Sequence, residues 1–200
     1  EIGNKGIALN IKEGTIKNSI FVGISQNNYL GSEGGDVVMT ESNWVVKEIN
    51  SIPVNITSAG YATFYAPVAV KVAEGVKAYT VTINGDWAIL NKIESGIIPA
   101  NTGVVLAGEV VDNKITPAVV GTHNFTITTA DAFEGENALE GTVAATYVTD
   151  DAYVLGVVEE KVGFYTATKN QNAGAAWLNN ANKAYLPASA VSNKSAAFYG

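Results

Sequence analysis

The chain has 200 residues, of which 47% are hydrophobic and 16% charged, and its formal net charge is −7. This composition is sufficient for a buried core and is not that of a disordered chain. The 12 lysines occur without a single arginine and form no basic cluster, so we expect no nucleic-acid partner. The absence of cysteine excludes a disulfide framework and a thiol nucleophile. No apolar run approaches the ~18 residues of a membrane-spanning segment.

Residues 1–50 are predicted to form a small β segment of their own. Short apolar stretches between turn residues indicate five strands, at 7–12, 20–24, 29–30, 36–40 and 44–49. Five such strands can form one lobe of a β-trefoil or a small sheet. Pro53 favours extended backbone and marks a seam, so we expect a second unit over residues 51–200.

Residues 51–200 have the pattern of an antiparallel β fold. The strands are short, turn signals recur every 8–12 residues or so, and no long segment has helical periodicity. The dipeptide Asn84-Gly85 predicts a hairpin that returns through Trp87. The continuous apolar run Val104–Ala107 predicts a strand buried on both faces. We therefore predict an all-β fold, an antiparallel β-sandwich or open barrel, with a small N-terminal β segment.

One strand–turn–strand unit occurs twice, which predicts two sheets or two halves of one sheet related by approximate symmetry. The first copy spans Val76–Thr82 and Ala100–Leu106, and the second spans Val162–Thr168 and Ala181–Leu186. Each copy contains an Ala-Asn step before its last strand. From this internal pseudo-repeat we expect buried tyrosines at 79 and 165, and asparagines at 101 and 182 that serve the backbone of the turn.

Four segments carry a resemblance to a known family, namely Gly60–Val70, Gly75–Tyr79, Ile98–Leu106 and the stretch from Tyr153 to Pro187. In order and spacing they resemble a C-terminal β-sandwich module of secreted and surface proteins of gut and oral Bacteroidetes. The resemblance covers residues ~51–200. It implies a secreted or cell-surface location (extracellular or outer-membrane-associated) and neighbouring domains of a larger protein as partners. It implies no reaction, because such modules accompany both glycan-active enzymes and adhesins.

The aromatic residues are the best indication of a ligand. The line from Phe21 through Tyr29 to Trp44 resembles one repeat of the ricin-type lectins, which implies sugar contacts at Tyr29, Asp36 and Trp44. Trp177 is a further candidate, because an indole face can stack on a sugar ring. The alternative for both Trp87 and Trp177 is that they fill the core, since they occupy strand positions in the repeat.

No catalytic set is evident, and we expect no enzymatic activity and no cofactor. His123 is the only histidine, so it cannot form a histidine-based metal site by itself. Carboxylate pairs at 134 and 136, 150 and 151, and 159 and 160 could serve a glycosidase only if they converged in a cleft. Calcium could bind the acidic loop 131–140, or Asp150-Asp151 with backbone carbonyls, but the spacing of an EF-hand is absent.

These patterns favour a non-catalytic accessory or adhesion module of a secreted bacterial surface protein. The alternative is a carbohydrate-binding module that uses exposed aromatic side chains, with glycans as partners. A glycan-hydrolase domain would require two convergent carboxylates, which the sequence does not display.

Overall fold

The computed structural model describes residues 37–40, 43–46, 50–85, 87–112, 114–171, 174–191 and 198–199. Within these residues the fold is all-β, as predicted, and every strand pairing is antiparallel. One short 3-10 helix follows the strand that ends at Pro187. No helix in the described part of the chain is long and apolar enough to cross a membrane.

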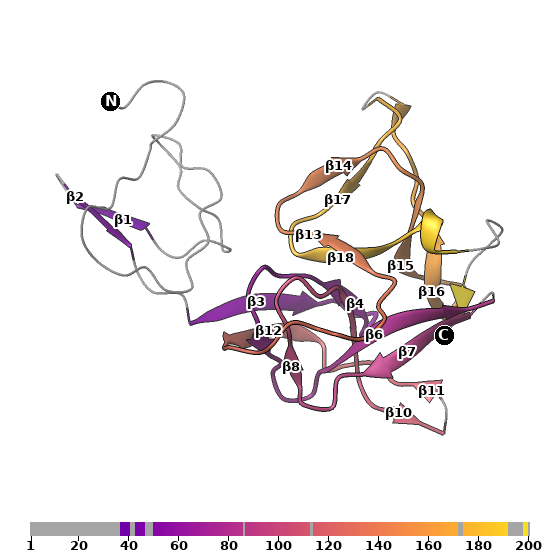
Figure 1. Cartoon of the computed structure of the whole chain (residues 1–200), viewed down its shortest axis with the longest axis horizontal. Helices are drawn as coiled ribbons and strands as arrows, with labels where there is room; N and C mark the ends of the chain where they lie inside the picture. Colours follow the sequence, from indigo (N-terminus) through magenta and orange to yellow (C-terminus); the bar gives the residue numbers. More distant parts are fainter. Residues whose placement is uncertain are drawn as a thin grey trace.

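Three larger sheets carry the fold (Figure 1). Sheet I has the order β3-β12-β5-β8, with bounds Ser51–Ile56, Gly121–Ile127, Val70–Lys71 and Ile97–Ile98. Sheet II has the order β4-β9-β6-β7, with bounds Ala62–Phe64, Val104–Ala107, Lys77–Asn84 and Trp87–Lys92. Sheet III has the order β13-β18-β15-β16-β19, with bounds Glu140–Thr142, Lys183–Pro187, Ala152–Val158, Lys161–Thr166 and Phe198–Tyr199.

Three two-stranded sheets complete the described strands. They pair β10 with β11, β14 with β17, and β1 with β2, with bounds Val110–Val111, Lys114–Ile115, Thr146–Val148, Trp177–Asn179, Val37–Thr40 and Asn43–Val46. The last of these agrees with the strands predicted at 36–40 and 44–49. The other strands predicted within residues 1–50, and hence the trefoil lobe, lie outside the described residues.

Sheet II is the middle layer of the molecule, because its two faces belong to two different cores. One core lies between sheets I and II and contains Val54, Phe64 and Phe125. The rings of Phe64 and Phe125 meet edge to face, with centroids 5.4 Å apart. The second lies between sheets II and III and contains Tyr79 and Leu186. A sheet covered on both faces needs apolar side chains at successive positions rather than at alternate ones.

Strand β9 meets that requirement and confirms the prediction from its continuous apolar run. Val104 and Leu106 enter the first core, whereas Val105 and Ala107 enter the second. All four residues are buried. The hairpin predicted at Asn84-Gly85 is also present, joining β6 to β7.

Sheets II and III have the same strand order, so the internal repeat of the sequence corresponds to two similar sheets. The hairpin β6-β7 and strand β9 correspond to the hairpin β15-β16 and strand β18, and β4 and β13 occupy the same outer position. Tyr79 pairs with Val105 in sheet II, and Tyr153 pairs with Leu186 in sheet III. The counterpart of Tyr79 is therefore Tyr153 and not Tyr165.

The expectations for the repeat were correct at Tyr79 and incomplete at Tyr165. Tyr79 is buried, and its hydroxyl donates to the carbonyl oxygen of Gly108 at 2.6 Å. Tyr165 is only half-buried, because it follows Phe164, which enters the second core, and so lies on the other face of sheet III. Its hydroxyl donates to the carbonyl oxygen of Lys161. Asn101 and Asn182 both adopt the left-handed conformation, with φ of 58° and 55°, as expected of turn residues.

Candidate functional site

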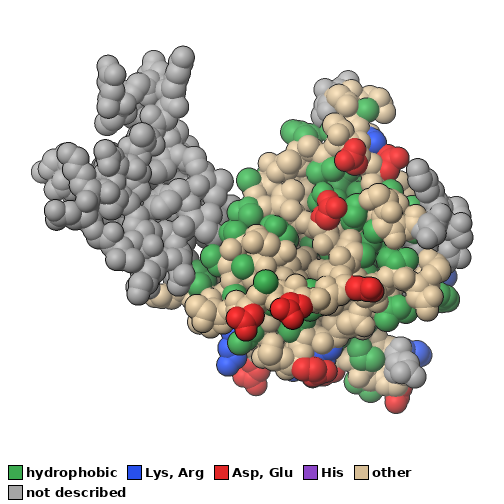
Figure 2. Space-filling view, in the orientation of Figure 1, with side chains coloured by type: hydrophobic (Ala, Val, Ile, Leu, Met, Phe, Trp, Pro, Cys, Tyr) green, Lys and Arg blue, Asp and Glu red, His purple; other side chains and the backbone are tan. Residues whose placement is uncertain are grey.

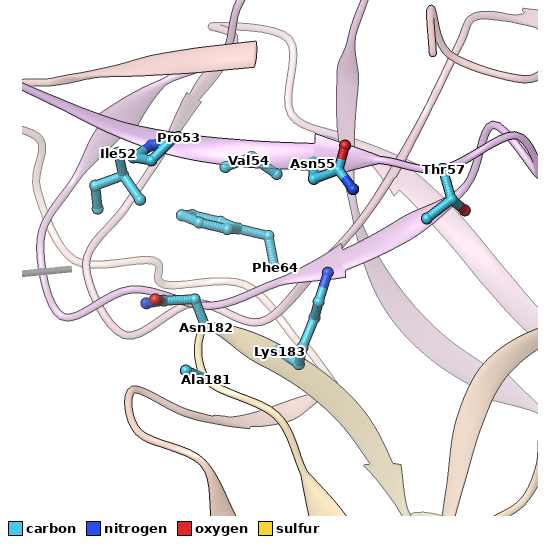
Figure 3. Close-up of a pocket in the computed structure, with 9 residues that line it drawn as sticks. All are labelled: Ile52, Pro53, Val54, Asn55, Thr57, Phe64, Ala181, Asn182 and Lys183. Atoms are coloured by element: carbon cyan, nitrogen blue, oxygen red, sulfur yellow. The ribbon is translucent and has the colours of Figure 1, made fainter. Parts of the chain in front are cut away.

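A polar cleft opens along the side of the molecule where two sheets end. Strand β3 is an edge strand of sheet I, and β4 is an edge strand of sheet II. Two hollows of about 330 Å³ each lie against these edges and against the turn before β18. Both are lined by Asn55, Thr57 and Lys183, and we call the pair the Lys183 cleft. Figure 3 shows the first hollow, with Lys183 rising toward β4.

Strand periodicity places the polar residues of β3 on the outside. Ile52, Val54 and Ile56 are buried in the first core, and Asn55 lies between them on the exposed side. Thr57 follows at the end of the strand and is also exposed. Because side chains alternate along a strand, the apolar residues that hold β3 to the core also direct Asn55 outward.

Hydrogen bonds fix the turn on the opposite wall. The side-chain amide of Asn182 donates to the carbonyl oxygen of Tyr65 at 3.0 Å, and the backbone N–H of Tyr65 donates to the carbonyl oxygen of Asn182 at 3.1 Å. Asn179 is buried, and its amide donates to Lys183 O and to Thr142 Oγ1, each at 2.9 Å. The turn is thus held to sheet II and to β13, so the cleft is preformed.

Among the described residues that line the two hollows, Lys183 is the only charged one. Its ammonium donates to the carbonyl oxygen of Thr63 at 3.3 Å. Among the described residues, no carboxylate lies within ion-pair distance of it, whereas Lys77, Lys92 and Lys169 all have such partners. Burial lowers the pKa of the Lys183 amine, because removal from water disfavours its charged form.

An exposed pair of one aromatic and one aliphatic side chain borders the second hollow. Tyr147 on β14 lies directly opposite Leu178 on β17, and directly paired residues share one face of an antiparallel pair of strands. Their exposed fractions are 62% and 45%. Leu178 lines the hollow, which places Tyr147 beside its rim. Sequence reasoning missed Tyr147, and its position within a short strand was the only signal for it.

The predicted sugar contacts are not brought together by the described part of the structure. Tyr29 and Asp36 lie outside the described residues, and Trp44 is described only as backbone in β2. Trp177 borders the second hollow, but it is only 5% exposed. Its ring packs edge to face on Tyr185, with centroids 5.1 Å apart, and its Nε1 donates to Asp150 O at 3.1 Å. Stacking on a sugar would require its release from this cluster.

The alternative of a core position is correct for Trp177 and wrong for Trp87, which is 58% exposed. Trp87 begins β7, the edge strand of sheet II, where Ala88 points inward and the residues on either side point outward. A large side chain can therefore occupy a strand position without entering the core.

The carboxylate pairs considered for glycosidase chemistry all lie on the surface. Residues 134, 136, 150, 151, 159 and 160 are exposed, and Asp151 pairs with Lys169 at 2.6 Å. Glu140 accepts a hydrogen bond from the hydroxyl of Tyr185 at 3.0 Å, and burial together with this carboxylate raises the pKa of Tyr185 to about 12.

Nε2 of His123 lies 2.7 Å from Val119 O. Within the described residues, no three His, Cys, Asp or Glu side chains are grouped to hold a metal.

Comparison with known proteins assigns no family to this chain. No family model matches it, and no match was found among curated proteins or among solved structures.

Proposed function

We propose that this chain is a non-catalytic accessory module of a secreted bacterial surface protein and that it binds a glycan in the Lys183 cleft. The observation that carries the proposal is the amide- and hydroxyl-rich lining of a preformed cleft, bordered by the exposed Tyr147–Leu178 pair. The secreted location rests on the family resemblance of residues 51–200.

The lining has the chemistry that sugar hydroxyls require. Asn55, Asn180 and Asn182 line the cleft, and each side-chain amide has two N–H donors and an accepting oxygen. Thr57 adds a hydroxyl that can donate and accept. A sugar hydroxyl likewise donates and accepts, so these groups can satisfy it from both sides. Each hollow is at the lower end of the 300–1,000 Å³ that is typical of small-molecule sites.

The aromatic rim supplies the apolar half of a sugar site. One face of a pyranose ring presents C–H groups, which pack on an aromatic ring, while its hydroxyls point to the periphery. Tyr147 is exposed next to the polar hollow, so a ring stacked on it can place hydroxyls toward Asn180. This arrangement assigns to Tyr147 the role that the sequence suggested for Trp177.

A glycan array followed by titration calorimetry tests the proposal. Tyr147→Ala and Asn55→Ala should each weaken the affinity for the best glycan about fivefold or more, with little change in thermal stability because both side chains are exposed. Trp87→Ala is the matched control, since it removes an exposed aromatic from β7, outside the cleft, and should change neither affinity nor stability. Absence of binding across the array, or binding that is indifferent to both cleft variants, would refute the proposal and favour a purely structural module.

A further inference from the structure

The Lys183 cleft has a charge distribution that differs from that of the whole protein. The chain contains 19 acidic residues and has a net charge of −7, yet none of the described Asp and Glu residues lines either hollow. On the face shown in Figure 2 the acidic side chains are dispersed among neutral ones. A cleft whose single charge is positive attracts an anion locally, although the molecule as a whole repels it.

The ammonium of Lys183 has capacity for a further partner. An ammonium has three N–H donors, and the structure shows one acceptor for it among the described residues, Thr63 O. A partly buried charge without a counter-ion costs free energy, and an anionic ligand would offset that cost. The neighbouring amides of Asn55 and Asn182 can donate to the remaining oxygen atoms of a bound anion.

The internal repeat shows that the turn does not require a lysine. Aligning the two left-handed asparagines, Asn101 and Asn182, places Thr102 at the position of Lys183. Thr102 is buried, and its hydroxyl donates to the carbonyl oxygen of Ala100, within its own turn. The first copy therefore completes the same turn with a small neutral residue, whereas the second directs a cation into a cleft.

We infer that the ligand of the Lys183 cleft is an acidic glycan, whose sugar carboxylate pairs with the ammonium of Lys183. The inference rests on the proposed function, because it specifies the chemical class of the glycan. Uronic acids and sialic acids both carry the required carboxylate. The neutral amide side chains of the lining then hydrogen-bond to the sugar hydroxyls, while Lys183 makes the cleft selective for sugars that carry a negative charge.

The test compares each acidic glycan with a neutral copy of itself. An array carries uronate and sialate glycans beside their carboxyl-reduced counterparts, and the best acidic glycan is then titrated against the wild-type chain, Lys183→Thr and Lys183→Arg. We expect carboxyl reduction and Lys183→Thr each to weaken binding about 10- to 100-fold, and Lys183→Arg to retain most of the affinity. The threonine is the residue that the first copy of the turn already accommodates, so Lys183→Thr should fold with unchanged stability or better.

The outcomes separate the two proposals. Equal binding of acidic and reduced glycans, or acidic binding that Lys183→Thr leaves unchanged, overturns the acidic specificity and leaves glycan binding intact. Absence of binding to every glycan overturns both proposals. If Lys183→Thr fails to fold, Lys183→Met serves as the second neutral variant, and unchanged binding by it overturns the inference in the same way.

Discussion

Gly141 is the position where one added methyl group should disturb both the fold and the cleft. A Cβ at this residue would lie 2.3 Å from Cγ and 2.5 Å from Cβ of Tyr65. The usual carbon–carbon contact distance is about 3.5 Å, so Cβ and Cγ of Tyr65 must move away by about 1 Å. Hydrogen bonds oppose this displacement, because the backbone N–H and C=O of Tyr65 are both hydrogen-bonded to Asn182. We expect Gly141→Ala to lower the free energy of unfolding by about 1–3 kcal/mol, the usual cost of overpacking.

Urea denaturation of paired variants measures this effect. Gly156→Ala is the control, because Gly156 also lies in a strand of sheet III and its nearest neighbour is the ring edge of Tyr165, at 3.2 Å, which can shift. That variant should be neutral or more stable by about 0.5 kcal/mol, since alanine restricts the unfolded chain. Since Asn182 directly precedes Lys183, Gly141→Ala should also weaken ligand binding. Equal stability of the two variants would refute the argued contact between residue 141 and Tyr65.

Three further outcomes follow from the packing and the charges. Leu106→Ala should cost about 2–5 kcal/mol of unfolding free energy, because Leu106 is completely buried in the middle layer; the exposed Ile89→Ala should cost much less, and equal losses in denaturant titrations would contradict the layering. Trp177→Phe should cost about 1–3 kcal/mol in the same assay, because it leaves Asp150 O without its donor, whereas wild-type stability would place the indole outside the cluster. Lys183→Met should be at least as stable as the wild type at neutral pH. Burial lowers the pKa of Lys183, so between that lowered pKa and about 10.4 the unfolded chain binds more protons than the folded one. Wild-type stability therefore rises with pH in this range, and any excess stability of Lys183→Met should shrink. An excess that stays constant in thermal melts from pH 7 to 10 would contradict this.

The parts of the fold that sequence reasoning predicts are those set by local patterns. A four-residue apolar run without polar interruption cannot face water on either side, and Val104–Ala107 is accordingly buried on both faces. Asn84-Gly85 predicts the tight hairpin correctly, and β6 and β7 pair as expected, although Asn84 itself ends β6 opposite Trp87 and the turn begins at Gly85, whose φ is 59°. Both features depend on residues within one segment.

The parts that it missed depend on which strands become neighbours. Tyr79 and Tyr165 have similar local sequences, but Tyr79 lies on the face of β6 that enters the second core, whereas in β16 it is Phe164 that enters this core and Tyr165 lies on the other face. Trp87 and Trp177 both begin strands, yet one lies on the open face of an edge strand and the other packs on Tyr185. Local sequence reports the alternation along a strand, but not which of the two faces is covered.

The cleft was missed for the same reason, because its walls come from distant segments. Lys183 contacts the backbone of Thr63 across 120 positions in the chain, and Asn182 contacts Tyr65 across 117. No spacing rule connects residues so far apart without knowledge of the sheet order. The sequence does contain the Ala-Asn steps, and these mark the turn on which Lys183 is placed.

The repeat explains how one fold can contain both a structural turn and a candidate binding turn. In sheet II the turn after Asn101 ends in a residue whose hydroxyl bonds within the turn, and that residue is buried. In sheet III the equivalent turn lies against the free edges of β3 and β4, where a long side chain can reach solvent. The backbone requirement, a left-handed asparagine, is the same in both copies. The residue after it is therefore free to differ, and the difference between Thr102 and Lys183 is where selection for a ligand could act without cost to the fold.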